Sequence, residues 1–282
     1  MNLTSPSQVK AWCIENGFHP NKVLGQNFLI DQNALKAIVD AGLEGCDVEK
    51  LNVERLNVLE IGPGLGVLTE EMLKRGCQVT AIEKDPVLAA RLENESKSKV
   101  EVERWWENLV VLAGDALDFL SSTSTPGFDL SGFPVMISNL PYQAGTRILL
   151  ELVKKRQLKS MTVLVQTEVA ERLAAGPGSK TRGLAGVWAQ LDYDVRIVRK
   201  VAASCFWPRP EIGSSVVRLD LHDRNIALSS EERDLFHRLT KKAFEHRRKQ
   251  LGSIFKDLIQ STARAEELSN DDWIQLVKGL IG

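Results

Sequence analysis

The sequence predicts an α/β fold: a mostly parallel sheet with helices on both faces, followed by a small all-helical domain. Two observations lead to this prediction. From residue 57 to residue 165, short apolar runs alternate with segments of helical periodicity, as in strands joined by helical crossovers. From about residue 229 onward, apolar residues recur at helical spacing. A chain of 282 residues is long enough for one large domain and a small one.

The first 30 residues are expected to be irregular, because Gly17, Pro20 and Gly25 interrupt any regular pattern. Asp31 then stands where a helix N-cap is favoured, ahead of an apolar stripe that begins at Ala34. The sequence therefore predicts a helix after Asp31 as the first regular element.

Five buried strands, separated by helices, are expected in the central region. The predicted strands are Asn57–Ile61, Gln78–Ile82, Leu109–Leu112, Pro134–Ser138 and Met161–Val165, and the predicted helices are Leu68–Lys74, Asp85–Asn94 and Arg147–Lys155. Residues 121–132, rich in Ser, Thr, Gly and Pro, are expected to form a loop. Two later segments, Tyr193–Val201 and Ser215–Leu221, alternate more strongly and predict an antiparallel completion of the sheet.

Three helices are expected at the C-terminal end of the chain, over Glu231–Phe244, Arg248–Ile259 and Asp271–Ile281. The change from alternating to helical pattern places a domain boundary near His222–Ser230. The predicted domains are therefore residues 1–225 and 226–282.

The composition predicts a cytoplasmic protein without a metal site. The cysteines are widely spread and form no Cys-x-x-Cys pair, which disfavours both zinc and a disulfide framework; they are Cys13, Cys46, Cys77 and Cys205. The polar N-terminus lacks the apolar run of a signal peptide. No apolar stretch of about 18 residues is present, so no contact with a membrane is expected.

The net charge of −1 hides a basic segment between Arg196 and Lys256, which carries 14 Lys and Arg against 7 Asp and Glu. A locally basic face can bind phosphates even in a nearly neutral chain. A solvated surface explains the same charges equally well.

A glycine-rich segment, Glu60-Ile-Gly-Pro-Gly-Leu-Gly66, follows the first predicted strand and precedes a helix. Gly62 and Gly64 permit close approach of a ligand to the backbone. Glu83 ends the next strand about 20 residues later, where a carboxylate can accept hydrogen bonds from the ribose hydroxyls of a nucleoside cofactor. The dinucleotide pattern would need glycine in place of Val67, and Pro63 lacks an N–H for a phosphate. The pattern thus favours S-adenosyl-L-methionine over NAD.

Asp115 and Ala116 follow the third predicted strand, on the side of the sheet where ligands bind in open α/β folds. The Asp115 carboxylate is a candidate acceptor for the amino group of the cofactor's adenine. An N-cap of the next helix is an equally good explanation.

The segment Asn139-Leu140-Pro141-Tyr142 follows the fourth predicted strand. An exocyclic adenine nitrogen is a poor nucleophile, and two acceptors that hold its N–H bonds favour attack on a methyl donor. The Asn139 side-chain oxygen and the Leu140 carbonyl are candidates for that pair, and Pro141 restricts the backbone between them and Tyr142. Tyr142 offers a flat face for a base extruded from its stack. Methyl transfer of this kind needs alignment of the reacting atoms and no metal.

These motifs together resemble the KsgA family of ribosomal RNA adenine N6-dimethyltransferases. The resemblance extends over nearly the whole chain, in order, through the segments already described and Gly25–Leu29, Gln166–Arg172, Ala175–Lys180, Phe206-x-Pro208-x-Pro210, Ser215–Leu219 and Ala243–Lys249. It implies a Rossmann-like class I methyltransferase sheet. It also implies a substrate, two adjacent adenines in the 3′-terminal hairpin of small-subunit rRNA that each receive two methyl groups, and a role in small-subunit biogenesis.

The resemblance implies site residues that spacing alone does not give. Gln26 and Asn27, with Leu29, would close over the cofactor, and Phe206 would stack on the target adenine opposite Tyr142. In the helical domain, the basic run Arg247–Lys249 would grip the rRNA of the small ribosomal subunit. We expect a monomer.

The sequence departs from the family pattern at a few positions outside the expected cofactor and acceptor groups; these are Arg182, Glu211, Gly213 and Ser253. The alternatives are a related resistance methyltransferase that modifies large-subunit rRNA, a DNA or protein methyltransferase, and a non-catalytic assembly factor. The presence of Asn139 and Glu83 argues against the last of these.

Overall fold

The computed structural model describes residues 1–46, 54–121, 128–222, 228–256 and 258–281. Within these residues the central feature is a seven-stranded sheet with the order β4-β3-β2-β5-β6-β9-β7. Its strands are β2 (Asn57–Ile61), β3 (Gln78–Glu83), β4 (Leu109–Ala113), β5 (Val135–Asn139), β6 (Ser160–Gln166), β7 (Tyr193–Val201) and β9 (Ser214–Leu221). The first five run parallel, and β9 and β7 are antiparallel additions, as predicted.

Alternation along the inner strands explains why helices cover both faces. On β5, Met136 belongs to the core cluster beneath α6 (Ala116–Ser121), α7 (Gly145–Lys155), α8 (Thr167–Ala174) and α9 (Leu184–Asp192). Its neighbours Val135 and Ile137 belong to the cluster on the other face, beneath α2 (Gln32–Leu43) and α4 (Val67–Lys74). Because successive side chains point to opposite faces, a strand buried on both sides is apolar over most of its length.

The predicted strands and the helices between them are confirmed, with small changes at their ends. Asp31 caps α2, because its Oδ1 accepts a hydrogen bond of 2.7 Å from the Ala34 N–H. The helix predicted from Asp85 is α5 (Pro86–Lys99), with Asp85 as its N-cap and a longer C-terminal end. The predicted loop at 121–132 lies partly outside the described residues and ends in a 3₁₀ turn, η3 (Leu130–Gly132).

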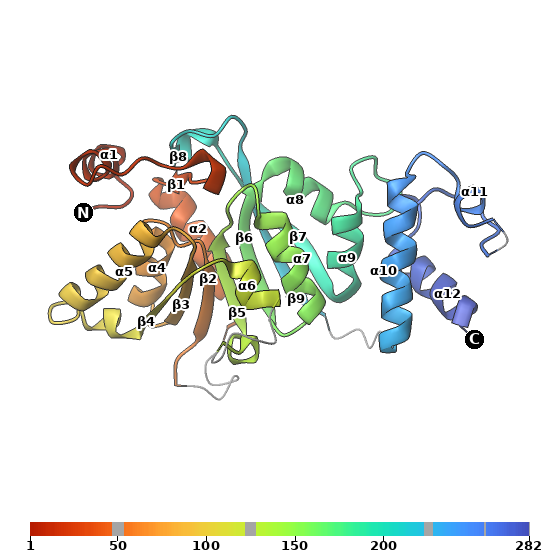
Figure 1. Cartoon of the computed structure of the whole chain (residues 1–282), viewed down its shortest axis with the longest axis horizontal. Coiled ribbons are helices and arrows are strands. Elements are labelled where there is room, and N and C mark those ends of the chain that lie inside the picture. Colours follow the sequence, from red (N-terminus) through yellow and green to blue (C-terminus); the bar gives the residue numbers. More distant parts are fainter. Residues whose placement is uncertain (47–53, 122–127, 223–227, 257, 282) are drawn as a thin grey trace.

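The expectation of an irregular N-terminus is wrong. Helix α1 (Pro6–Glu15) begins with proline at its first position, where the missing N–H costs nothing, and it buries Val9 and Cys13 one turn apart. It is followed by η1 (Lys22–Leu24) and β1 (Phe28–Leu29), which pairs with β8 (Phe206–Trp207) in a separate two-stranded sheet. Figure 1 shows α1 at one end of the molecule, above α4 and α5.

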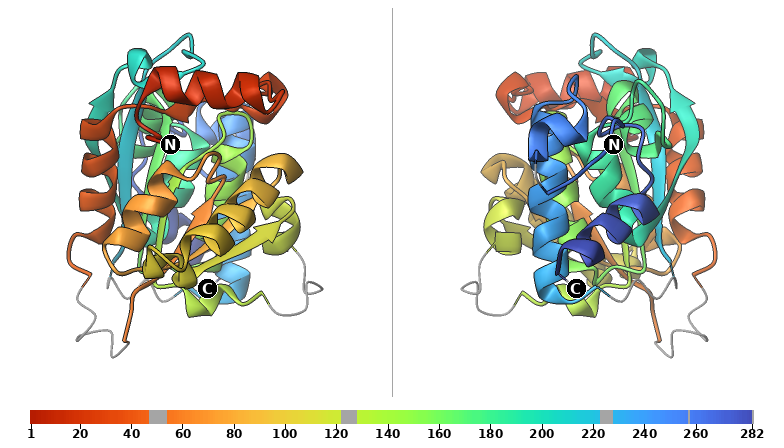
Figure 2. Two further views of the ribbon diagram at one scale, coloured as in Figure 1. Left: turned by 90° about the vertical axis from the view of Figure 1, so that its left-hand side faces the viewer. Right: turned by 90° about the vertical axis from the view of Figure 1, so that its right-hand side faces the viewer.

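The C-terminal helices pack at the opposite end of the molecule (Figure 1). They are α10 (Ser230–Glu245), α11 (Leu251–Phe255) and α12 (Asn270–Ile281), and they share a core cluster with Val187 and Leu191 of α9. Figure 2 shows α10 and α12 side by side on this face. Helix α11 is shorter than the predicted Arg248–Ile259, and the predicted domain boundary at residue 225 lies outside the described residues.

Buried Asp192 connects the sheet region to these helices. Its carboxylate accepts two hydrogen bonds of 2.9 Å from Arg233 of α10 and pairs with Arg156 at 2.9 Å. The described part of the chain contains no helix long and apolar enough to cross a membrane.

Candidate active site

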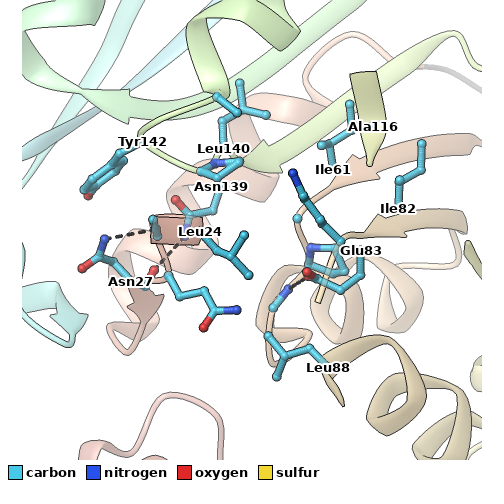
Figure 3. A pocket seen from close by; sticks show the side chains of 18 of the residues that line it. Leu24, Asn27, Ile61, Ile82, Glu83, Leu88, Ala116, Asn139, Leu140 and Tyr142 are labelled. Carbon is cyan, nitrogen blue, oxygen red and sulfur yellow. Dashed lines mark hydrogen bonds between the residues drawn. The ribbon is translucent and has the colours of Figure 1, made fainter. Parts of the chain in front are cut away.

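A cavity of about 470 Å³ lies at the carboxyl ends of the parallel strands (Figure 3). It is lined by these residues expected at the site: Gln26, Asn27, Leu29, Gly62, Gly64, Glu83, Asp115, Ala116, Asn139, Leu140, Pro141 and Tyr142. They come from four strand ends and from the N-terminal strap, our name for residues 21–29. The fold thus assembles positions that are more than 100 residues apart in the sequence.

The glycine loop between β2 and α4 has no glycine N–H free for a phosphate. Gly62 N–H donates to the Ile82 carbonyl, Gly64 N–H to the Glu83 carboxylate and Gly66 N–H to the Pro63 carbonyl, each at 2.9 Å. All three glycines have positive φ, from 60° to 86°, which disfavours other residues. A Cβ on Gly64 would lie 3.2 Å from the Phe28 ring. The loop therefore offers a close backbone surface whose glycine N–H groups are not available to a pyrophosphate.

Glu83 is the buried carboxylate at the end of β3. One oxygen accepts from Gly64 N–H and the other from Asp85 N–H, both at 2.9 Å. Burial raises the pKa of Glu83, and these backbone donors oppose the rise. A carboxylate has about four lone-pair sites, so two remain for a ligand with a pair of hydroxyl groups.

A second buried carboxyl group, Glu60, lies behind the loop and was not singled out from the sequence. It is 1% exposed, and the Thr69 hydroxyl donates to its Oε2 at 2.6 Å. Burial raises its pKa to about 8, and the nearby Glu83 adds to the rise. Glu60 is therefore largely protonated at neutral pH.

Asp115 has the N-cap role considered for it and also lies at the cavity. Its Oδ1 accepts from Leu117 N–H at 2.9 Å at the start of α6, and its Oδ2 accepts from Lys84 Nζ at 2.7 Å. The hydrogen bond from Lys84 lowers the pKa of Asp115, which keeps the group ionised. The residue caps the helix and still lines the cavity.

Asn139 is held by the strap in one orientation. Its Nδ2 donates to the Asn27 carbonyl oxygen at 3.2 Å. The side-chain oxygen, Oδ1, therefore points away from the strap. None of the described residues donates to the Asn139 Oδ1 or to the Leu140 carbonyl oxygen. The Leu140 N–H is fixed on the Leu164 carbonyl of β6 at 3.2 Å. Two adjacent acceptors therefore remain open at the end of β5.

Tyr142 lies at the side of the cavity away from Ala116 (Figure 3). Its hydroxyl forms a hydrogen bond of 2.6 Å with Ser214 Oγ at the start of β9, and burial raises its pKa. This bond fixes the ring while leaving the residue partly exposed. The sequence did not indicate Ser214, because a serine at a strand end carries no signal of its own.

Hydrogen bonds and close backbone packing hold the strap on both sides of the cavity. The Gln26 side chain donates to Asp85 Oδ2 at 2.8 Å and accepts from Asn21 N–H at 2.7 Å. Gly25 has φ +67°, and a Cβ there would lie 3.0 Å from the Tyr142 nitrogen. Gln26 and Asn27 thus join the Glu83 side of the site to its Asn139 side.

The structure does not bring Phe206 to the cavity. Its side chain is 2% exposed and packs in the core cluster that contains Leu29, its partner in the β1–β8 pair. In this structure the ring is therefore buried in the core and does not line the cavity with Tyr142, because the pairing directs it inward.

The basic run at the end of α10 has two different parts. Arg247 donates to the Lys180 carbonyl and lies 3.6 Å from Glu266, so it holds the loop before α9 against the C-terminal segment. Arg248 and Lys249 are exposed. Of the three residues, these two are the ones available to a nucleic acid.

Comparison with known proteins identifies the family. A family model described as ribosomal RNA adenine dimethylase matches residues 17–277. A protein of Deinococcus radiodurans named ribosomal RNA small subunit methyltransferase A is 43% identical over 225 residues, which cover 77% of this chain and 67% of the relative. The protein of the same name from Lactobacillus johnsonii is 35% identical over 280 residues, which cover 96% and 89%.

Solved structures share the fold. A dimethyladenosine transferase from Plasmodium falciparum matches with a TM-score of 0.68 at 23% identity, over 88% of this chain and 95% of the other. The 23S rRNA methyltransferase ErmE matches with a TM-score of 0.63 at 22% identity, over 91% and 100%. These likenesses confirm the predicted class I methyltransferase fold. The family match and the relatives at 43% and 35% identity establish that the chain belongs to the ribosomal RNA adenine dimethylase family of methyltransferases.

Proposed function

We propose that this chain uses S-adenosyl-L-methionine to dimethylate N6 of two adjacent adenines in the 3′-terminal hairpin of small-subunit rRNA. It acts as a monomer in the cytoplasm, during small-subunit biogenesis. The family match and the names of the relatives support the reaction and the RNA. The open acceptor pair at Asn139 and Leu140 is the observation that carries the proposal for this chain.

The residues of the cavity fit the proposed cofactor. Glu83 retains lone pairs for the two ribose hydroxyls, and Asp115 can accept from the adenine amino group. The glycine N–H groups are already engaged, which suits a cofactor without phosphates. The apolar side chains of Ile61 and Ile82 line the remaining wall. When bound, S-adenosyl-L-methionine supplies an electrophilic methyl carbon whose sulfur leaves without needing a proton.

The acceptor pair acts on the target amino group. The Asn139 Oδ1 and the Leu140 carbonyl oxygen accept its two N–H bonds and hold the nitrogen lone pair toward the methyl carbon. With the methyl donor bound, the nitrogen would take the methyl group as the sulfur leaves, and the proton released from the nitrogen would pass to one of the two acceptors or to water. After one methylation an N–H remains for either acceptor, so the same pair can serve the second transfer.

Tyr142 supports the base during this reaction. An adenine that leaves its stack loses stacking energy, and an aromatic face returns about 1–3 kcal/mol per base. The hydrogen bond to Ser214 keeps the ring in place before the base arrives. Exposed Arg248 and Lys249 would contact rRNA phosphates at the other end of the molecule.

One experiment tests the proposal as a whole. Small subunits that lack adenine dimethylation are incubated with the protein and with cofactor labelled on its methyl group, and the nucleosides are separated and mapped. We expect N6,N6-dimethyladenosine at two adjacent positions near the 3′ end. Label in large-subunit rRNA instead would favour the resistance-type alternative, and no label in any RNA would exclude an rRNA methyltransferase.

A further inference from the structure

Lys84, the residue that follows Glu83, forms an ion pair across one end of the cavity. Its Nζ lies 2.7 Å from Asp115 Oδ2, and the two side chains are 59% and 28% exposed. Both residues line the cavity, and Asp115 directly precedes Ala116 in the chain. Nothing in the sequence singles out Lys84, because a lysine after a strand is an ordinary surface residue.

The ion pair fixes the Asp115 carboxylate in one plane. Its Oδ1 is held by the Leu117 N–H at 2.9 Å, and its Oδ2 is held by Lys84. Each oxygen can accept about two hydrogen bonds, so each has one position left. The group is oriented and still able to accept from a ligand.

The backbone keeps this carboxylate in register with Glu83. The Gly114 N–H donates to the Glu83 carbonyl at 2.8 Å, and Glu83 pairs with Ala113 between β3 and β4. A backbone hydrogen bond and a side-chain ion pair therefore connect the two acidic residues. An exposed ion pair contributes little to the stability of a fold, so we expect the main effect of Lys84 on the ligand site rather than on folding.

The chemistry of purines shows what such an acceptor selects. A 6-amino purine presents an N–H donor at position 6, which an ionised carboxylate accepts. A 6-oxo purine presents a carbonyl oxygen there, whose lone pairs face those of the carboxylate. We propose that Lys84 is a positioning residue that holds Asp115 as a selective acceptor, so that the cavity takes adenosyl rather than inosyl compounds. This inference rests on the proposed function, because it assigns the cavity to a nucleoside cofactor.

The test measures the dissociation constants of S-adenosylhomocysteine and S-inosylhomocysteine by calorimetry with the full-length protein. Lys84→Met removes the charge, Lys84→Arg keeps it, and Asp115→Asn removes the acceptor charge. Lys154→Met is the matched control, because Lys154 forms a 2.9 Å ion pair with Glu151 on an exposed part of α7. Thermal midpoints show whether each variant is folded.

We expect the unmodified protein to bind the adenosyl compound more tightly than the inosyl compound. In Lys84→Met, the dissociation constant of the inosyl compound divided by that of the adenosyl compound should fall about threefold to fivefold, an effect of the size that an exposed ion pair can have. Lys84→Arg should restore the ratio and Lys154→Met should leave it unchanged. If Lys84→Met weakens both ligands equally, or changes neither, the inference is overturned while the cofactor assignment stands. If neither ligand binds the unmodified protein, the proposed function fails with it.

Discussion

The Asn139 side chain donates a hydrogen bond of 3.2 Å to the Asn27 carbonyl of the N-terminal strap. Because the partner is a carbonyl, the amide nitrogen must face the strap, and the oxygen is left as the acceptor on the other side. The segment that covers the cavity therefore also orients the side chain proposed to hold the target base. In the proposed function, enclosure of the cofactor and recognition of the target base would depend on this one contact.

Glu83 should determine cofactor affinity. Glu83→Gln replaces one accepting oxygen with an amide nitrogen, which cannot accept hydrogen bonds from the backbone N–H groups or the ribose hydroxyls. A hydrogen bond to a charged group contributes about 1.5–3 kcal/mol. We therefore expect at least a tenfold rise in the dissociation constant of S-adenosyl-L-methionine. Calorimetry measures the constant. Glu101→Gln, on an exposed turn, is the control. An unchanged constant for Glu83→Gln would contradict the ribose assignment.

The pKa of Glu83 gives the same assignment a pH dependence. Binding of the hydroxyls needs the ionised carboxylate, and burial raises the pKa of the group. Affinity should therefore decrease as the pH falls, beginning at a higher pH than an ordinary carboxyl group would give. Affinity that stays constant down to pH 4 would exclude Glu83 as the group that binds.

Glu60 should make the protein less stable as the pH rises. Its pKa is about 8 in the folded state against an ordinary value of 4.5, so the folded chain holds a proton that the unfolded chain has lost between these values. Stability from this group is complete below pH 4.5 and is lost progressively up to about pH 8. One pKa unit corresponds to about 1.4 kcal/mol, so the loss amounts to several kcal/mol.

Urea unfolding between pH 5 and pH 9 measures this effect. Glu60→Gln keeps the shape and an acceptor for Thr69 but cannot ionise, so its free energy of unfolding should decline less over this range than that of the unmodified protein. Glu101→Gln should behave like the unmodified protein. Equal slopes for Glu60→Gln and the unmodified protein would show that Glu60 is ionised when folded.

The two exposed residues of the basic run should act on RNA alone. The double variant Arg248→Ala, Lys249→Ala should bind small-subunit rRNA more weakly and lower the salt slope by about two, with an unchanged thermal midpoint. Arg247→Ala should instead lower the midpoint, because it releases the Lys180 carbonyl and Glu266. Lys97→Ala, on exposed α5, is the charge control. An unaltered salt slope in the double variant would place the RNA contact elsewhere.

The strands could be predicted because burial on two faces makes most of a strand apolar, as in Met161–Val165, and the residues of the site follow directly after such strands. Helix α1 was missed because it buries only Val9 and Cys13, which is too little apolar surface for a clear pattern. The inward position of Phe206 depends on its pairing with Leu29, 177 positions earlier, which local sequence does not encode. Lys84 and Ser214 became part of the site only through contacts between distant segments.

The central claim is that the open amide oxygen of Asn139 holds the target nitrogen. It is tested most directly by Asn139→Ala, with cofactor binding and methyl transfer to unmethylated small subunits measured on one preparation. Asn57→Ala is the control, since Asn57 also donates to a backbone carbonyl at 3.2 Å but lies at the opposite end of β2. We expect Asn139→Ala to bind the cofactor within about threefold of the unmodified protein, the loss of one modest hydrogen bond, and to transfer no methyl group. Transfer at the normal rate by this variant would contradict the account.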